Sequence, residues 1–163
     1  MAESFTTKLT GGDKLAAALK EMAEKVKNPG TLSVGFQDGS TDEKGVSNAF
    51  KAAMNEYGGQ MSDYGTATTH YKAPTPPRPF FRTMVAEKSG TWAGDIEKLL
   101  KANDYDATVT LDYMGDKIKG QLVDSIFNGG WVPNKPSTLK RKAGTQPLVD
   151  TGAMSNSVTW VVK

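Results

Sequence analysis

The sequence predicts an α+β fold, in which helices cover a small, mainly antiparallel sheet of three to four short strands. Apolar residues recur every three or four positions over several long segments, as they do along one face of a helix. Shorter segments alternate apolar and polar residues, which is typical of half-buried strands. The chain has 163 residues, and no linker-like stretch divides it. We therefore expect residues 1–163 to form a single domain around one core.

The first three elements are predicted to be a strand, a helix and a second strand. Alternation over residues 5–9 predicts a short first strand. Asp13 can cap the helix that follows. The apolar residues of this helix form one stripe, at Leu15, Leu19, Met22 and Val26. Pro-Gly at 29–30 ends the helix, and alternation over 31–37 predicts the second strand.

The middle of the chain combines a helix, a long loop and a proline-rich segment. Helical spacing of apolar residues over 46–57 predicts the helix, which two glycines at 58–59 terminate. Residues 60–75, which include His70, show no period and predict a loop or an extended hairpin. The prolines at 74–79 stiffen the approach to the next helix, because proline fixes the backbone and is tolerated in a first helical turn.

Two long helices and a final strand complete the prediction. The first covers about 81–99, and Gly90 within it favours a bend or a break, since glycine costs about 1 kcal/mol relative to alanine inside a helix. The second repeats apolar residues over 111–126. One helical turn at 153–154 leads into an alternating segment at 158–162, which predicts the last strand.

Composition and missing motifs argue against catalysis. The chain has no Cys, which excludes disulfides, thiolate metal sites and cysteine nucleophiles. It contains no phosphate-binding loop, dinucleotide-binding fingerprint, zinc-protease motif or serine-hydrolase elbow. We expect no catalytic, cofactor-binding or metal-binding residue. A hydrolase that uses His70, the only histidine, is the remote alternative; it predicts a loss of activity in His70→Ala, whereas we favour a surface or packing role.

The net charge of +2 is too weak to indicate a nucleic-acid partner by itself. The densest positive segment holds Lys135, Lys140, Arg141 and Lys142, and its simplest interpretation is a solvated loop with a short helical turn. No stretch approaches the ~20 apolar residues of a membrane span, and the N-terminus lacks a signal-peptide pattern. We expect a soluble protein, made in a cytoplasm, without a membrane partner.

Large apolar residues are scarce. Leu, Ile, Val and Phe together make up less than a fifth of the chain, which is a low share for a self-sufficient core. This composition favours burial of some apolar surface against partner subunits.

Two local patterns stand out. In the first, a stiff proline segment brings two adjacent rings and two arginines to the start of a helix: Pro76, Pro77, Arg78, Pro79, Phe80, Phe81 and Arg82. Adjacent helical residues point about 100° apart, so one ring can enter the core while the other faces a neighbour. A polyproline ligand is the alternative, but the following helix competes with the extended conformation it needs. The second pattern is a capped turn before the last strand, with Pro147, Leu148, Asp150, Thr151 and Gly152.

Together these segments resemble the tail-completion or neck proteins of tailed bacteriophages. The resemblance covers most of the chain from about residue 10. It rests on the order of four elements: Glu56-Tyr57-Gly58-Gly59, the proline-arginine-phenylalanine segment, Thr138-Leu139 with Lys142, and the turn at 147–152. It implies a small α+β protein without enzymatic activity or cofactor, which forms part of a ring where the tail joins the capsid connector. Relatives commonly have a shorter stretch at 60–75, so this chain carries an insertion there.

The resemblance also implies partners and a location. The partners are other copies in a ring, the neighbouring tail-tube or terminator protein and the head-connector protein, while genomic DNA passes through without specific binding. The location is the virion neck, after assembly in the host bacterial cytoplasm. Two alternatives remain: a tail-terminator subunit of the same junction, and a DNA-binding packaging accessory protein that uses the basic run at 140–142.

Particular residues follow from these expectations. Aromatic anchors and arginines are favoured in protein interfaces. The candidate subunit-interface residues are therefore Arg78, Phe80, Phe81, Arg82 and Trp131. The candidate structural residues of the motifs are Pro77, Pro79, Pro147, Leu148, Asp150, Thr151 and Gly152.

Overall fold

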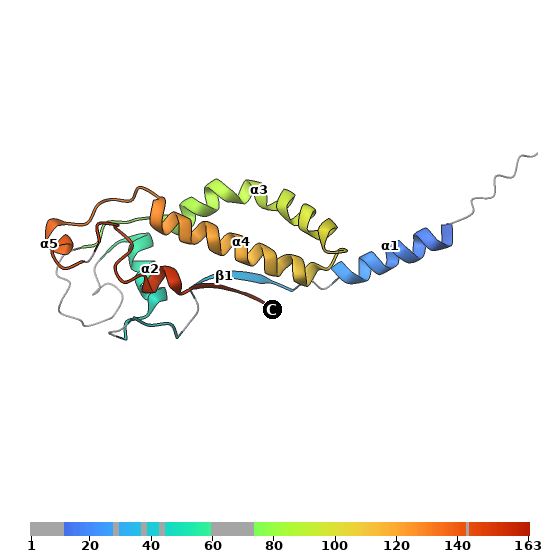
Figure 1. Cartoon of the computed structure of the whole chain (residues 1–163), viewed down its shortest axis with the longest axis horizontal. Helices are drawn as coiled ribbons and strands as arrows, with labels where there is room; N and C mark the ends of the chain where they lie inside the picture. The colour runs from blue at the N-terminus through green and yellow to red at the C-terminus, as the bar shows by residue number, and fades with distance from the viewer. Residues whose placement is uncertain (1–11, 28–29, 37–38, 43–44, 60–73, 143) are drawn as a thin grey trace, which may run out of the picture.

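The computed structural model describes residues 12–27, 30–36, 39–42, 45–59, 74–142 and 144–163. In these ranges the fold is mixed helix and strand, as the sequence predicts, and helix predominates (Figure 1). The elements in chain order are α1 (Gly12–Val26), β1 (Leu32–Phe36), α2 (Asn48–Tyr57), α3 (Phe80–Ala102), α4 (Ala107–Asn128), α5 (Pro136–Leu139), α6 (Ala153–Asn156) and β2 (Val158–Val162).

The sheet consists of β1 and β2, which pair antiparallel although they come from opposite ends of the chain. Leu32 lies opposite Val162, and Phe36 lies opposite Val158. The prediction of three to four strands is not confirmed within the described residues, and the expected strand at 5–9 lies outside them. A two-stranded sheet is marginal alone, and here α4 supplies the apolar support that further strands would give.

The two long helices form an antiparallel hairpin, and α4 lies between α3 and the sheet. A tight turn joins the helices, with positive φ angles at Asp104 and Tyr105. Gly90 lies inside one continuous helix, so the predicted break at this position does not occur. On α4, Gly115 lets the backbone approach the Trp160 ring of β2, because a Cβ at position 115 would overlap that ring.

The core lies where α3 begins, between α4 and the sheet. Phe80 of α3 is 1% exposed and meets the ring of Phe36 edge-on, with 6.1 Å between ring centroids. The largest side chains that are almost completely buried include Phe80, Met84, Met114, Leu122, Ile126 and Val158. The predicted apolar stripe of α4 accounts for the contribution of this helix to the core.

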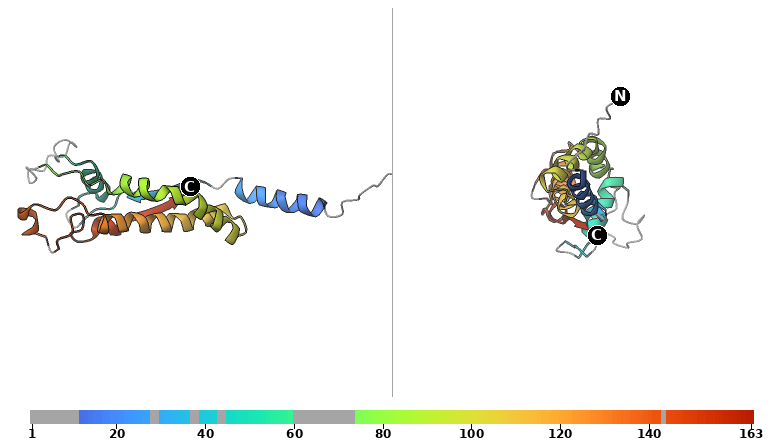
Figure 2. Two further views of the ribbon diagram at one scale, coloured as in Figure 1. Left: turned by 90° about the horizontal axis from the view of Figure 1, so that it is seen from above. Right: turned by 90° about the vertical axis from the view of Figure 1, so that its right-hand side faces the viewer.

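Helix α1 differs from α2, α3 and α4 because none of its residues is buried. It extends beyond the end of the molecule at which α4 begins and the chain ends (Figures 1 and 2). The predicted helix is confirmed, but its apolar stripe faces solvent: Leu15 is 63% exposed and Leu19 is 56% exposed. None of the described helices is long and apolar enough to cross a membrane.

Candidate functional site

Two of the four segments that carry the sequence resemblance, 56–59 and 76–82, meet where α2 ends and α3 begins. Pro79 at the start of α3 offers no capping side chain. Instead, the backbone N–H of Phe81 donates to Oε2 of Glu56 at 2.9 Å, and the N–H of Arg82 donates to Oε1 at 3.2 Å. The Glu56 side chain is only 8% exposed. A carboxylate from α2 therefore satisfies the first free donors of α3, at the end of the helix where the dipole favours negative charge.

Arg82 closes the same junction from the α3 side. Its guanidinium donates to the carbonyl oxygen of Glu56 at 3.3 Å and lies over the Tyr57 ring, 5.5 Å from the centroid. More than half of the Arg82 side chain stays exposed, 55% by area. Arg82 thus combines a structural contact with a charged surface that is free to meet a partner.

Arg78 connects three parts of the chain. Its guanidinium donates to the Val132 carbonyl at 2.8 Å, to Oδ1 of Asn55 at 3.1 Å and to Oδ1 of Asn134 at 3.0 Å. The residue is 4% exposed, and burial lowers the pKa of its guanidinium. All three acceptors are neutral, so the planar fork of donors holds the α2 end, the α3 start and the loop after α4 in a fixed arrangement.

The structure divides the five candidate interface residues into two groups. Phe80 and Arg78 are buried inside the chain, where their side chains stabilise the fold and leave little surface for a partner. Phe81, Arg82 and Trp131 keep part of their surface. The indole N–H of Trp131 donates to the Ser125 carbonyl at 2.7 Å, which fixes the ring against the end of α4.

The second motif is the turn that brings the chain into β2. Leu148 is 7% exposed and belongs to the core. Gly152 has a φ of 79°, a left-handed conformation that glycine adopts without strain, and it starts α6. Hydrogen bonds from Asn134 and Lys142 to the Pro147 carbonyl, at 3.3 and 3.4 Å, fix the turn against the preceding loop.

The remaining motif residues have simpler positions. Asp150 and Thr151 are exposed, and the hydroxyl of Thr151 accepts the N–H of Ala153 at 3.4 Å. Pro77 lies against Gly58. A Cβ at position 58 would lie only 2.8 Å from the Pro77 nitrogen, and the φ of Gly58 is 73°, so the position leaves no room for a side chain. The glycine and the proline of the motifs are therefore complementary in shape.

The basic run at 140–142 is divided by the fold. Lys140 and Arg141 are exposed beside α5, at the opposite end of the molecule from α1 (Figure 1). Lys142 is half-buried, and its ammonium donates to the Gln146 carbonyl at 2.7 Å. Burial lowers the pKa of Lys142. Two of the three cations, together with the exposed Lys135, are thus free to meet a polyanion.

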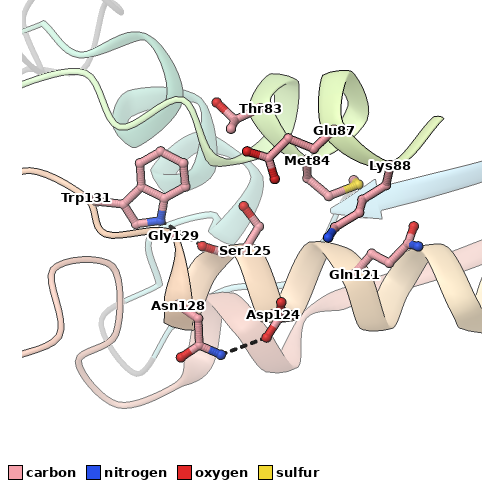
Figure 3. Close-up of a pocket in the computed structure, with 10 residues that line it drawn as sticks. All are labelled: Thr83, Met84, Glu87, Lys88, Gln121, Asp124, Ser125, Asn128, Gly129 and Trp131. Carbon is pink, nitrogen blue, oxygen red and sulfur yellow. Dashed lines mark hydrogen bonds between the residues drawn. The ribbon is translucent and has the colours of Figure 1, made fainter. Parts of the chain in front are cut away.

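A small hollow lies between the first half of α3 and the end of α4 (Figure 3). Its volume is about 110 Å³, below the roughly 300 Å³ at which small-molecule sites begin. Asp124 on its wall accepts a hydrogen bond from Asn128 at 2.7 Å. Within the described ranges, no three His, Asp or Glu side chains gather as metal ligands would. His70 and the rest of 60–73 lie outside the described residues.

Sequence reasoning missed the roles of Glu56, Asn55 and Asn134. A capping carboxylate is found from sequence when it lies three residues after its own helix cap, whereas Glu56 caps a helix that starts 24 residues later. The available signal was the order of the two motif segments at 56–59 and 76–82. This order indicated that the segments belong together, but it did not indicate which atoms are in contact. Comparisons of the chain with protein-family models, with curated proteins and with solved structures gave no match.

Proposed function

We propose that the chain is a non-enzymatic structural subunit of a tailed-bacteriophage virion, part of a ring at the head-tail junction that joins the tail to the capsid connector. The observation that carries the proposal is the α2–α3 junction. Glu56 and Arg82 come from separate motif segments of the resemblance, and they form one hydrogen-bonded unit. Residues that the resemblance groups by order are thus also grouped by direct contact, which supports a common structural origin of the two segments.

The surface supports an assembly role. Several large apolar side chains are more than a third exposed in the described part of the chain, among them Leu15, Leu19, Tyr57, Tyr113 and Val132. Exposed apolar area that is gathered on one element indicates a contact with another protein. The chain is low in large apolar residues, and the exposed apolar stripe of α1 supports the burial of part of its surface against a partner.

A tail-terminator subunit is the near alternative, since such a subunit would occupy a ring at the same junction. A DNA-binding packaging accessory protein is the more distant one, and the exposed Lys135, Lys140 and Arg141 favour it. If that alternative holds, Lys140→Ala with Arg141→Ala reduces the salt dependence of DNA retention by about two counterions. The head-tail proposal predicts weak retention that these substitutions leave unchanged.

Localisation in the virion tests the proposal. Gold-labelled antibodies against the chain, applied to purified particles, are expected to mark the junction between head and tail. Antibodies against a capsid protein provide the control for access to the particle. Label along the tail shaft or at its tip, or absence of the chain from purified virions by mass spectrometry, would contradict the proposal.

A further inference from the structure

Within the described ranges, the sheet consists of β1 and β2 alone, so each strand has one edge that pairs with no other described strand. Thr31 and Lys163 form a hydrogen-bonded pair. The N–H of Thr31 donates to the Lys163 carbonyl at 2.7 Å, and the N–H of Lys163 donates to the Thr31 carbonyl at 3.1 Å. Because bonded and non-bonded pairs alternate in an antiparallel ladder, the backbone groups of Leu32 and Val34 point outward from β1, and those of Trp160 and Val162 point outward from β2. No backbone bond to these outward groups occurs among the described residues.

Neither edge carries the usual protection against pairing. Proteins commonly protect exposed strand edges with lysine, proline or a bulge. Leu32–Phe36 and Val158–Val162 contain no charged residue and no proline, and their pairing is continuous over five residues. The two edges also suit each other, since β2 of one copy set beside β1 of another continues the antiparallel order. An extended strand of the same chain is therefore a fitting partner for each edge.

An apolar groove lies at the same end of the molecule as α1. The groove is formed by the start of α4 and the end of β2, has a volume of about 380 Å³ and is lined by Thr108, Val109, Asp112, Tyr113 and Val162. Tyr113 is 55% exposed and Val109 is 39% exposed. Because α1 immediately precedes β1, a copy whose β1 pairs with a neighbouring β2 brings its α1 to the end of that β2, beside this groove.

We propose that copies of the chain associate in a repeating order, each through two different surfaces. β1 of one copy pairs with the free edge of β2 in the next copy, and the apolar stripe of α1 lies in the α4–β2 groove of that next copy. This inference rests on the proposed ring function and names the surface that builds the ring. The contact uses different surfaces on the two copies, so its repetition around an axis closes a ring without leaving free edges.

The size of the contact supports the combination of strand pairing with the α1 contact. A helix of 15 residues is roughly 22 Å long, and the groove that receives it is lined by five residues, whereas a standard interface takes about 20–30 residues from each partner. The helix contact alone is therefore small for a stable complex. Pairing of the five-residue strand edges enlarges the contact and provides hydrogen-bond partners for the outward backbone groups.

Cysteine cross-linking tests the geometry directly, because the chain has no native Cys. Leu19→Cys and Tyr113→Cys are prepared separately, mixed and treated with a short bis-maleimide. We expect a cross-linked dimer in the mixture, and a ladder of multimers from the double variant. Dimers of Leu19→Cys alone would instead show a two-fold contact, and cross-links confined within single molecules of the double variant would show that α1 folds back; either result overturns the inference.

A charge placed on the stripe tests the energetics. Leu19→Asp is expected to weaken self-association in analytical ultracentrifugation at least tenfold, because it buries a carboxylate in the apolar groove. Ala17→Asp introduces the same residue on the opposite face of α1, and we expect no change. Since α1 has no buried residue, both variants keep the fold, which circular dichroism verifies.

Two further results would overturn the inference: equal association of Leu19→Asp and the wild type, or a wild-type chain that stays monomeric at millimolar concentration. These outcomes are separate from the localisation test. A chain that is found at the neck but does not associate in this way leaves the proposed function in place and overturns only the proposed contact between copies.

Discussion

At the residue scale, the start of α3 depends on side chains that are distant in sequence. Glu56 supplies the cap, and Arg78 fixes the backbone just before the helix. Both residues are buried and polar, and all of their hydrogen-bonding partners belong to the chain itself. Both residues therefore act mainly in the stability of the fold. Of their neighbours, Arg82 is exposed and Phe81 is partly buried against the core, so these two keep surface for the proposed contact with a partner.

Removal of the Glu56 carboxylate is expected to destabilise the protein. Glu56→Ala leaves the N–H groups of Phe81 and Arg82 without their acceptor in a part-buried position, and we expect a loss of about 2–3 kcal/mol in the free energy of unfolding. Urea denaturation measures it. Glu87→Ala, at an exposed position of α3, the helix that Glu56 caps, is the control, with an expected change below about 0.5 kcal/mol. Equal effects of the two substitutions would contradict the capping role.

Arg78→Lys preserves the charge and removes the fork of donors. One ammonium cannot reach the Val132, Asn55 and Asn134 acceptors together, so we expect a loss of about 2–4 kcal/mol by the same measurement. Arg82→Lys at the exposed neighbouring position is expected to cost less than about 1 kcal/mol. An Arg78→Lys protein as stable as the wild type would show that charge alone, without the geometry of the fork, is sufficient.

At the element scale, periodicity in the sequence predicted most of the structure. The stripe at 111–126 and the alternation at 158–162 are strong local signals, and α4 and β2 form where they occur. The pairing of β1 with β2 was not predictable, because it joins segments more than 120 residues apart and no local pattern encodes such a contact. Of the bend or break expected near Gly90, the break does not occur, since the cost of one glycine is smaller than the gain from a long hairpin with α4.

The contact between α4 and the sheet depends on a missing side chain. Gly115→Ala places a methyl group in the space of the Trp160 ring, and we expect a net loss of about 1–3 kcal/mol in the free energy of unfolding despite the better helix propensity of alanine. Gly120→Ala in the same helix meets no atom within 4 Å and is expected to stabilise by up to about 1 kcal/mol. Thermal denaturation of the two variants is expected to shift in opposite directions; shifts of the same sign would contradict the packing described.

An ion pair stabilises the α3–α4 hairpin and makes its stability depend on pH. Lys117 Nζ lies 2.6 Å from Oδ2 of Asp95, and this contact with the ammonium holds the Asp95 pKa below its ordinary value. The stabilisation is therefore present above the ordinary carboxyl pKa and is lost as the pH falls through the lowered one. Carboxyl NMR titration is expected to show a higher Asp95 pKa in Lys117→Met than in the wild type. An identical Asp95 pKa in both proteins would contradict the stabilisation by the Lys117–Asp95 ion pair.

At the scale of the whole molecule, the chain combines a packed body with an element that has no support of its own. The body provides the hairpin, the sheet and the α2–α3 junction, while α1 extends from one end (Figure 2). The apolar stripe of α1 is exposed. The stripe itself was predictable from spacing. Its exposure was not, because an amphipathic pattern states which face is apolar but not whether the surface that covers it belongs to the same chain.

Electron microscopy of lysates tests the proposed role of the chain at the head-tail junction, with a phage that carries a nonsense mutation in the gene for this chain. We expect filled heads beside separate, full-length tails, and intact virions again when the wild-type chain is supplied from a plasmid. Intact virions in normal numbers without the chain would show that heads and tails join without it.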